Sequence, residues 1–273
     1  MVLNILSENT AYSKDFACEH GLSIHLEAEG QKLLFDTGAG PLFLENAKRL
    51  DLDIADVDFL FLSHSHYDHG GGIKAFLEVN KKAKAYLSAK AFGDYYALRE
   101  GGDYEYIGLD KNLKANKRIK ESVDGLKFGE IFEVLSAVEG SDFIAKANAG
   151  LFKKEGATRV SDDFAHEQSL IVRVGGKSLL ITGCAHKGIV AILKSYHAKY
   201  SNYPDFVIGG FQLSSRSGGQ VKDKLIEEIG LFLKRSGAQF YTGHCTGLEA
   251  YGKLKTIMGG KLDYAAAGRV IKI

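Results

Sequence analysis

Short apolar runs recur along the N-terminal half of the chain, and two of them alternate with polar residues as half-buried strands do. The alternating runs, residues 22–27 and 32–36, flank the turn Glu29-Gly30 and predict a hairpin, with His25 expected to point outward. Continuous apolar runs predict buried strands at residues 2–6, 57–62 and 85–88. Helical spacing at residues 42–50 and 73–80 predicts helices between these strands. This order favours helices packed on a sheet.

The second half of the chain repeats this arrangement. The apolar run 169–174 turns at Gly175-Gly176 and returns as 177–182, which predicts a second hairpin. Further strands are expected at residues 131–135, 206–210 and 239–244, and helices at residues 187–200 and 221–236. Several of the predicted strands end in glycine, histidine or cysteine. Because ligands of α/β proteins bind beyond the carboxyl ends of strands, we expect these ends to form one rim.

Residues 93–129 are the least patterned stretch and are rich in tyrosine and lysine. Two interpretations stay open for it. It is either a substrate-facing lid that supplies aromatic rings and cations for a phosphate or carboxylate, or a solvated insertion. No linker rich in proline, glycine or serine divides the 273 residues. We therefore predict a single domain, residues 1–273, with this stretch as a variable insertion.

The composition is that of a globular protein, with 45% apolar and 25% charged residues. A net charge of +1 creates no broad field, so we expect a small-molecule partner and neither nucleic acid nor membrane. Three cysteines are an odd number in so long a chain, and two of them lie inside motifs that contain a neighbouring histidine, so no disulfide framework is expected. The first 16 residues lack a signal-peptide pattern, and no apolar run approaches the ~18 residues of a membrane span. These features predict a cytoplasmic, unanchored protein.

The densest chemistry directly follows the strand predicted at residues 57–62. Residues 63–72 are Ser-His-Ser-His-Tyr-Asp-His-Gly-Gly-Gly, with three imidazoles and a carboxylate inside six positions. His64 and His66 lie two apart in chain that leaves a strand, so both side chains point the same way and can bind one cation. Asp68 and His69 follow after the chain has turned and suit a second cation nearby. A set of hydrogen-bonded surface histidines is the alternative, which such dense spacing disfavours.

This motif, H-x-H-x-D-H after a hydrophobic strand, resembles the signature of the metallo-β-lactamase superfamily of binuclear metal hydrolases. The resemblance extends along nearly the whole chain, through the motifs Glu19-His20-Gly21-Leu22-Ser23, Leu34-Phe35-Asp36-Thr37-Gly38, Gly183-Cys184-Ala185-His186, Gly209-Gly210-Phe211 and Gly243-His244-Cys245-Thr246-Gly247. Together the motifs resemble the superfamily II branch that includes the dihydropterin:ribofuranosylaminobenzene-phosphate synthase of methanopterin biosynthesis. The resemblance implies an α/β fold built as a four-layer αββα sandwich. It also implies two divalent cations per chain, with Zn²⁺ expected and Mn²⁺ or Fe²⁺ as alternatives.

The resemblance also indicates the remaining metal ligands. His244 matches the last metal-binding histidine of the superfamily. Cys184 occupies the place of the aspartate that bridges the two metals in the superfamily, and His186 follows two residues later. We expect His186 to be a ligand, whereas Cys184 is either a ligand or part of the pocket wall. His166 lies near the superfamily's third histidine motif but lacks the glycine of that motif, so its role as a ligand stays open.

Three further residues are candidates for the pocket or for support of the metal loop. Asp36 matches an aspartate that supports the metal-binding loop in the superfamily, and a turn that satisfies its own backbone is the alternative. His20 belongs to a branch motif and either lines the pocket or is structural. Gln212 replaces the histidine of the Gly-Gly-Phe-His-Leu sequence common among relatives. Since an amide cannot shuttle protons near neutral pH, the synthase assignment cannot be transferred intact.

The favoured function is a binuclear metal-dependent hydrolase of a small, anionic, cytosolic molecule. A metal-activated bridging hydroxide would attack the substrate. Asp68 would orient that hydroxide, bind the second metal or protonate the leaving group. A pterin-transferring synthase, which condenses two organic substrates, is the first alternative. A non-catalytic, metal-bound ligand sensor is the second, and the complete set of candidate ligands argues against it. A diiron oxygen-reducing relative is disfavoured because that group typically has glutamate at the position of His66.

Overall fold

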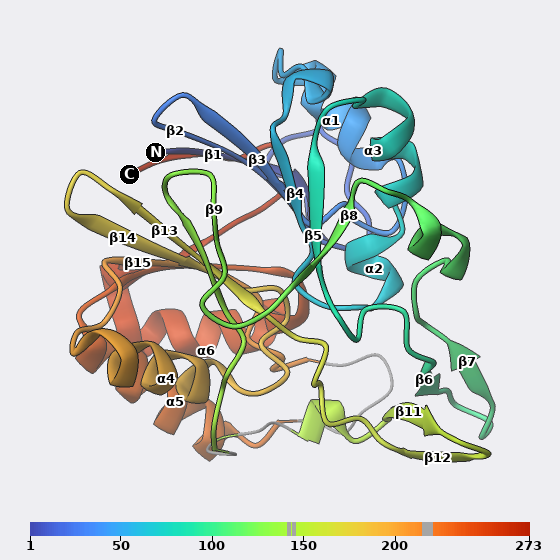
Figure 1. Ribbon diagram of the computed structural model, residues 1–273. Coiled ribbons are helices and arrows are strands. Elements are labelled where there is room, and N and C mark those ends of the chain that lie inside the picture. The colour runs from blue at the N-terminus through green and yellow to red at the C-terminus, as the bar shows by residue number, and fades with distance from the viewer. Residues whose placement is uncertain (141–142, 144–145, 215–220) are drawn as a thin grey trace.

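Two β-sheets lie face to face in the computed structural model, which describes residues 1–140, 143, 146–214 and 221–273 (Figure 1). The first sheet has seven strands in the order β18-β1-β2-β3-β4-β5-β8. Their bounds are β1 Val2–Ser7, β2 Ser23–Ala28, β3 Gln31–Phe35, β4 Phe59–Phe61, β5 Lys84–Ser88, β8 Ile119–Ser122 and β18 Val270–Lys272. The predicted first hairpin is β2 and β3, which pair antiparallel. The amino group of Met1 donates to the carbonyl of Ile273, so the two ends of the chain meet at the edge of this sheet.

The second sheet also has seven strands, in the order β17-β16-β15-β14-β13-β10-β9. Their bounds are β9 Lys127–Phe128, β10 Phe132–Leu135, β13 Ser169–Val174, β14 Lys177–Ile181, β15 Phe206–Gly209, β16 Gln239–Thr242 and β17 Leu262–Tyr264. The predicted second hairpin is β13 and β14, in which Leu170 lies opposite Ile181. Strands β14 to β17 run parallel, so their carboxyl ends lie at the same edge.

Helices cover the outer face of each sheet (Figure 1). The helices are α1 Leu42–Arg49, α2 Tyr67–Gly70, α3 Ile73–Val79, α4 Ile189–Tyr200, α5 Asp223–Ser236 and α6 Leu248–Met258. Single 3₁₀ turns lie at Ile54–Asp56, Lys111–Ala115, Lys146–Asn148, His244–Thr246 and Gly259–Lys261. Helix α5 ends where Gly237 adopts a φ of 80°, a left-handed conformation that glycine adopts without a steric penalty. Within the described ranges, no helix is both long and apolar enough to cross a membrane.

Three apolar layers hold these elements together. Phe35 and Phe61 of the first sheet meet Val172 and Ile181 of the second in the layer between the sheets. Helices α1 and α3 pack on the outer face of the first sheet, and α4, α5 and α6 pack on that of the second. Each fully buried large apolar side chain contributes about 1.5–3 kcal/mol relative to an exposed one. The four-layer αββα architecture predicted from the resemblance is confirmed.

The expectation that His25 points outward is wrong. Its side chain is buried, and its Nδ1 lies 3.3 Å from the Asn4 amide nitrogen. Strand β2 lies inside a sheet with apolar layers on both faces, and the position of His25 is covered, whereas Glu27 near the end of the strand is exposed. Burial lowers the pKa of His25 to about 4, which keeps the imidazole neutral near pH 7.

The stretch 93–129 contributes to three sheets. Strands β8 and β9 belong to the large sheets, whereas β6 and β7 join two later strands in a small sheet of order β12-β11-β6-β7. The bounds of this small sheet are β6 Tyr95–Leu98, β7 Tyr104–Tyr106, β11 Leu151–Glu155 and β12 Thr158–Ser161. The small sheet extends to one side of the sandwich (Figure 1).

Candidate metal centre

The carboxyl ends of five strands converge on one rim. Asp36 follows β3, the His64–His69 loop follows β4, Cys184 and His186 follow β14, Gln212 follows β15, and His244 follows β16. Four non-glycine residues of this rim have positive φ angles: Asp36 at 56°, Ala185 at 56°, Gln212 at 49° and His244 at 50°. A left-handed backbone costs about 1–2 kcal/mol at such a residue. Strain of this kind gathers at functional sites, where the surrounding structure holds it in place.

A glycine lets two of these strand ends approach closely. A Cβ atom on Gly183 would lie 2.2 Å from Ser63 Oγ and 2.9 Å from His64 Nδ1. Only glycine therefore allows the loop after β14 to lie against the loop after β4. This contact brings Cys184 and His186 to the histidines of the first sheet.

One group of imidazoles consists of His64, His66 and His186, all buried. The Nε2 atoms of His64 and His186 are 3.3 Å apart. The His66 Nε2 atom is also buried, and no described residue forms a hydrogen bond with it. The structure thus brings His64 and His66 together, as their spacing predicts, and adds His186 from the other sheet.

A second group consists of Asp68, His69 and His244. The His244 Nε2 atom lies 3.1 Å from His69 Nε2 and 3.3 Å from Asp68 Oδ2, and His69 Nε2 lies 3.7 Å from the same carboxylate oxygen. The His20 Nε2 atom lies 3.3 Å from Asp68 Oδ2, at the partly exposed edge of the group. Asp68 and His69 therefore face a different partner from His64 and His66, as expected from the turn in the chain between them.

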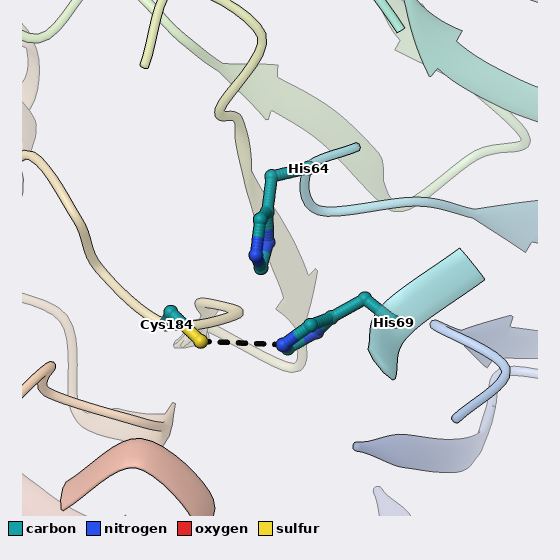
Figure 2. A group of neighbouring side chains, drawn as sticks. All are labelled: His64, His69 and Cys184. Carbon is teal, nitrogen blue, oxygen red and sulfur yellow. Dashed lines mark hydrogen bonds between the residues drawn. The ribbon is translucent and has the colours of Figure 1, made fainter. Parts of the chain in front are cut away.

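Cys184 lies between the two groups. Its Sγ is 3.2 Å from His69 Nε2 and belongs to one cluster with His64 and His69, whose side chains point toward it (Figure 2). The same sulfur also lies close to the side chains of His244 and Cys245. Burial, together with the neighbouring Cys245, raises the pKa of the Cys184 thiol well above its usual value. A bound cation is the kind of group that would make this thiol a thiolate.

In four of the candidate imidazole ligands, a polar group contacts the Nδ1 atom, which faces away from the centre. Asp36 Oδ2 lies 2.6 Å from His69 Nδ1, and the amide oxygens of Asn9 and Asn148 lie 2.8 Å from His244 Nδ1 and 2.9 Å from His186 Nδ1. Ser63 Oγ donates to Asp36 and so accepts from His64 Nδ1 at 2.9 Å. Because these oxygens accept, the proton of each neutral ring lies on Nδ1 and the lone pair lies on Nε2. Polar groups hold metal-binding histidines in the same way.

The Nε2 lone pairs then face one another across the centre. For His64 and His186, two acceptors at 3.3 Å have no hydrogen between them, which is unfavourable unless a cation lies there. For His69, burial opposes the charged ring, but the carboxylates of Asp36 and Asp68 raise its pKa, so a proton can bridge His69 and His244. A cation would replace that proton. The donor set therefore fits divalent metal ions.

Four of the histidines are held neutral. Burial and the neighbouring imidazoles lower the pKa of His64 and of His186 well below the usual value. Burial likewise lowers the pKa of His66 to about 3 and that of His244 to about 4. Near pH 7 these rings offer lone pairs and not positive charges, which is the state that a metal requires.

The metal-free chain is expected to stay folded at neutral pH, because its core is large, and to lose stability as the pH falls below about 6.5. In that window the unfolded chain protonates its histidines while the folded chain keeps His66 and His244 neutral, so the unfolded state binds more protons. The fall in the His244 pKa from 6.5 to about 4 corresponds to about 3 kcal/mol. The raised pKa of His69 stabilises the folded state at low pH, but this single contribution is opposed by four histidines of the centre with lowered pKa values. Urea unfolding of chelated protein between pH 7.5 and 5 checks this, and unchanged stability would contradict it.

His166 lies beside the centre. The Ser65 backbone N–H donates to its Nδ1 at 3.1 Å, and its Nε2 lies 3.1 Å from Asp162 Oδ2. The side chains of His66, Asp162 and His166 are close enough together to share an ion. Both ring nitrogens of His166, however, already have hydrogen-bond partners. His166 thus contacts the loop that carries His64 and His66 through its Nδ1 atom.

Several residues of the site were not identified from the sequence. Glu8 accepts from the His244 backbone N–H and the Tyr264 hydroxyl, and Glu167 accepts from the backbone N–H groups of His186 and Lys187. Asn9, Asn148 and Cys245 were missed as well. The polar loop after β1 was the available signal for Glu8 and Asn9, and Cys245 directly follows His244.

A cavity of about 210 Å³ opens onto the centre. The lining residues are Asn9, His20, His66, Tyr67, Asp68, Ala97, Arg99, Ile107, Leu151, Cys184, His186, Gln212, Ser214, His244 and Cys245. The Gln212 amide oxygen is buried there and has no hydrogen-bond partner among the described residues. His20 and Gln212 thus both line this cavity. Asp36 and His166 do not line the cavity but form hydrogen bonds with the loop that carries His64 to His69.

Known proteins resemble this chain over its whole length. Residues 18–135 match the family model of the metallo-beta-lactamase superfamily. The chain is 30% identical to an uncharacterized protein of Methanocaldococcus jannaschii, with 100% of both chains covered. It is 28% identical to the 7,8-dihydropterin-6-methyl-4-(beta-D-ribofuranosyl)-aminobenzene-5'-phosphate synthase of the same organism, over 99% of this chain and 96% of that relative.

Solved structures show the same similarity. Tm1679, a metal-dependent hydrolase of the beta-lactamase superfamily, matches with a TM-score of 0.81 and 28% identity, covering 100% of this chain and 99% of its own. The Zn²⁺-bound PqqB of Methylobacterium extorquens covers 100% of both chains with a TM-score of 0.59 and 11% identity, so it shares the fold alone.

Proposed function

The chain belongs to the metallo-β-lactamase superfamily, and from this premise we propose that it is a hydrolase that uses two divalent cations to act on a small anionic molecule. Zn²⁺ is the expected metal, since imidazole and thiolate ligands suit it. The proposal includes no nucleic-acid or membrane partner.

The convergence of the Nε2 atoms carries this proposal. Four rings have their Nδ1 atoms held from outside, and their Nε2 atoms approach in pairs at 3.3 Å and 3.1 Å. One cation would be held by His64, His66 and His186, and the other by Asp68, His69 and His244. Cys184, whose sulfur lies between the two groups of residues, would be a further ligand available to either cation. When bound, the cations would supply Lewis acidity and lower the pKa of water at the site.

Asp68 is the proposed catalytic residue. Burial opposes its charge, but His69, His20 and His244 hold the pKa of its carboxyl well below the usual range. It is therefore a carboxylate at neutral pH and can accept a proton as the substrate is attacked. His20 lies 3.3 Å from it at the partly exposed edge and offers a route for that proton to solvent.

A condensing synthase is the second candidate function. It is favoured by the 28% identity to a relative named as a dihydropterin synthase. It is opposed by Gln212, an amide at a position where relatives of that branch commonly have histidine. Hydrolysis consumes one organic substrate and condensation consumes two. A screen of phosphodiesters, lactones, thioesters and pterin pyrophosphates, each supplied alone and with a second substrate, separates the two candidates.

Purified protein is expected to contain about two divalent metal ions per chain. Replacing both His64 and His66 by alanine should lower this to about one or less, because one cation then keeps only His186 and the shared Cys184. Elemental analysis after dialysis against a weak chelator measures it. His197→Ala is the matched control, since His197 is exposed on α4 and should leave both ions bound. A double variant that still holds two tight ions would overturn the assignment.

A further inference from the structure

One wall of the cavity is formed by the small sheet. In its register Ala97 lies opposite Leu151 on one side and Glu105 on the other, so these three side chains share a face. Arg99 lies two residues after Ala97, and Ile107 two residues after Glu105, on that same face. Ala97, Arg99, Ile107 and Leu151 all line the cavity. The wall is thus a small apolar surface with a guanidinium on it.

This wall is fixed to the metal-binding loop. The backbone N–H of Tyr67, next to His66, donates to the carbonyl of Ile107 at 2.8 Å. The Tyr95 ring on β6 lies 4.1 Å from the His166 ring, centroid to centroid, and His166 in turn accepts from Ser65. Tyr67 and Leu151 pack against the buried cluster Tyr95, Ala97 and Ile107. A molecule that binds the wall is therefore held in a set position relative to the centre.

Arg99 carries the charge of this wall. Its Nε donates to Glu105 Oε2 at 2.5 Å, which holds the side chain along the sheet, and 29% of the Arg99 side chain is exposed. The planar, charged fork of a guanidinium matches a carboxylate or phosphate group, and the contact with Glu105 orients the Arg99 fork beside the cavity. Apart from histidines and cysteines, the charged residues that line the cavity within the described part of the chain are Asp68 and Arg99. Asp68 belongs to the centre, which leaves Arg99 as the cation for a remote part of the substrate.

We propose that this wall is a recognition subsite for the part of the substrate remote from the cleaved bond. It would take a short apolar ring or chain that ends in an oxyanion, a carboxylate or a phosphate. Ala97, Ile107 and Leu151 contact the apolar part, and Arg99 binds the oxyanion. This inference rests on the proposed function and specifies the substrate class of the same site.

The other face of the small sheet has a different role. Arg159 lies over the rings of Tyr96 and Tyr104, at 4.7 Å and 4.6 Å from their centroids. Tyr96 and Tyr104 are not among the residues that line the cavity. The rings of Tyr96 and Tyr104 therefore stack away from the site, whereas the Tyr95 ring packs on His166. The stretch 93–129 contributes apolar surface and Arg99 to the cavity. Arg159 provides a matched control on the same sheet.

Two probes that differ only at the remote end test the subsite. Phenylphosphonate offers one acidic group, and 4-phosphonobenzoate adds a carboxylate across the ring. Calorimetry on the metal-loaded protein should show that 4-phosphonobenzoate binds at least 10-fold more tightly. Arg99→Gln should abolish this difference, whereas Arg159→Gln should preserve it. Benzene-1,4-diphosphonate, compared in the same way, shows whether the subsite favours phosphate over carboxylate.

The outcomes separate the subsite from the metal centre. Binding of phenylphosphonate that is lost in the His64→Ala, His66→Ala double variant reports the centre, and the difference between the two probes reports Arg99. If wild-type protein binds both probes equally, or if Arg99→Gln keeps the difference, the subsite proposal is overturned while the proposed function stands. If the wild-type protein takes up no metal but still binds 4-phosphonobenzoate more tightly than phenylphosphonate, and Arg99→Gln removes that difference in affinity, the proposed function fails and the subsite stands.

Discussion

Asp68→Asn is expected to lower hydrolytic turnover about 10³-fold and to reduce the metal content from about two ions per chain to about one. The Asp68 carboxylate lies 3.3 Å from both His20 and His244 and is held in its charged form by the imidazoles around it. Asparagine has the same shape but carries no charge and cannot accept a proton. The variant therefore removes both a metal ligand and the proposed proton acceptor without creating a cavity.

Turnover and metal content should be measured on the same preparation, with the substrate found in the screen. Asp163→Asn is the matched control, because Asp163 is a carboxylate paired with Lys153 outside the centre. That control should keep both ions and at least half of the turnover. An Asp68→Asn protein that retains two ions and full turnover would remove Asp68 from the mechanism. Loss of turnover with both ions retained would restrict Asp68 to proton transfer.

The ligand loop could be predicted from the sequence because its geometry is local. Strand β4 leaves His66 in extended backbone, with φ −82° and ψ 145°, so His64 and His66 project to the same side. The single turn α2 then redirects the chain before Asp68 and His69. The spacing of these four residues along the chain therefore separated the two pairs.

The groups that hold the ligands could not be predicted, because they act across long separations in sequence. Asn9 reaches His244 across 235 residues, and Asn148 reaches His186 across 38. A single asparagine carries no local pattern, so its role depends on the fold that brings it there. Strand β8 shows the same limit, since its residues Ile119–Ser122 are polar enough to suggest a loop and are ordered by parallel pairing with β5.

The error at His25 has a related cause. Alternation predicts which residues share a face of a strand, but not whether that face meets solvent. In this four-layer sandwich the middle of β2 is covered on both faces, so His25 must find a partner inside, and Asn4 supplies one.

His186→Ala is expected to lose more metal than Cys184→Ser. His186 joins His64 and His66 in one group, so its removal leaves that cation with two imidazoles and the shared sulfur. Cys184 lies 3.2 Å from His69 and close to His64, so it is placed to contact both cations, each of which keeps three other protein ligands without it. Serine retains an oxygen at the same place, which weakens two sites modestly and abolishes neither.

Metal stoichiometry of the two variants, measured side by side after dialysis against a weak chelator, decides the matter. We expect about one ion per chain for His186→Ala and about two for Cys184→Ser, with the second variant losing its ions at a lower chelator concentration than wild type and more readily as the pH falls. Asn148→Ala serves as an intermediate case, because it keeps the His186 ring but removes the oxygen that holds its Nδ1. The metal affinity of Asn148→Ala should fall about 10-fold or more, while the number of bound ions per chain stays unchanged. Loss of an ion from Cys184→Ser with both ions kept by His186→Ala would contradict this expectation. Cys184 would then replace His186 as the third ligand beside His64 and His66.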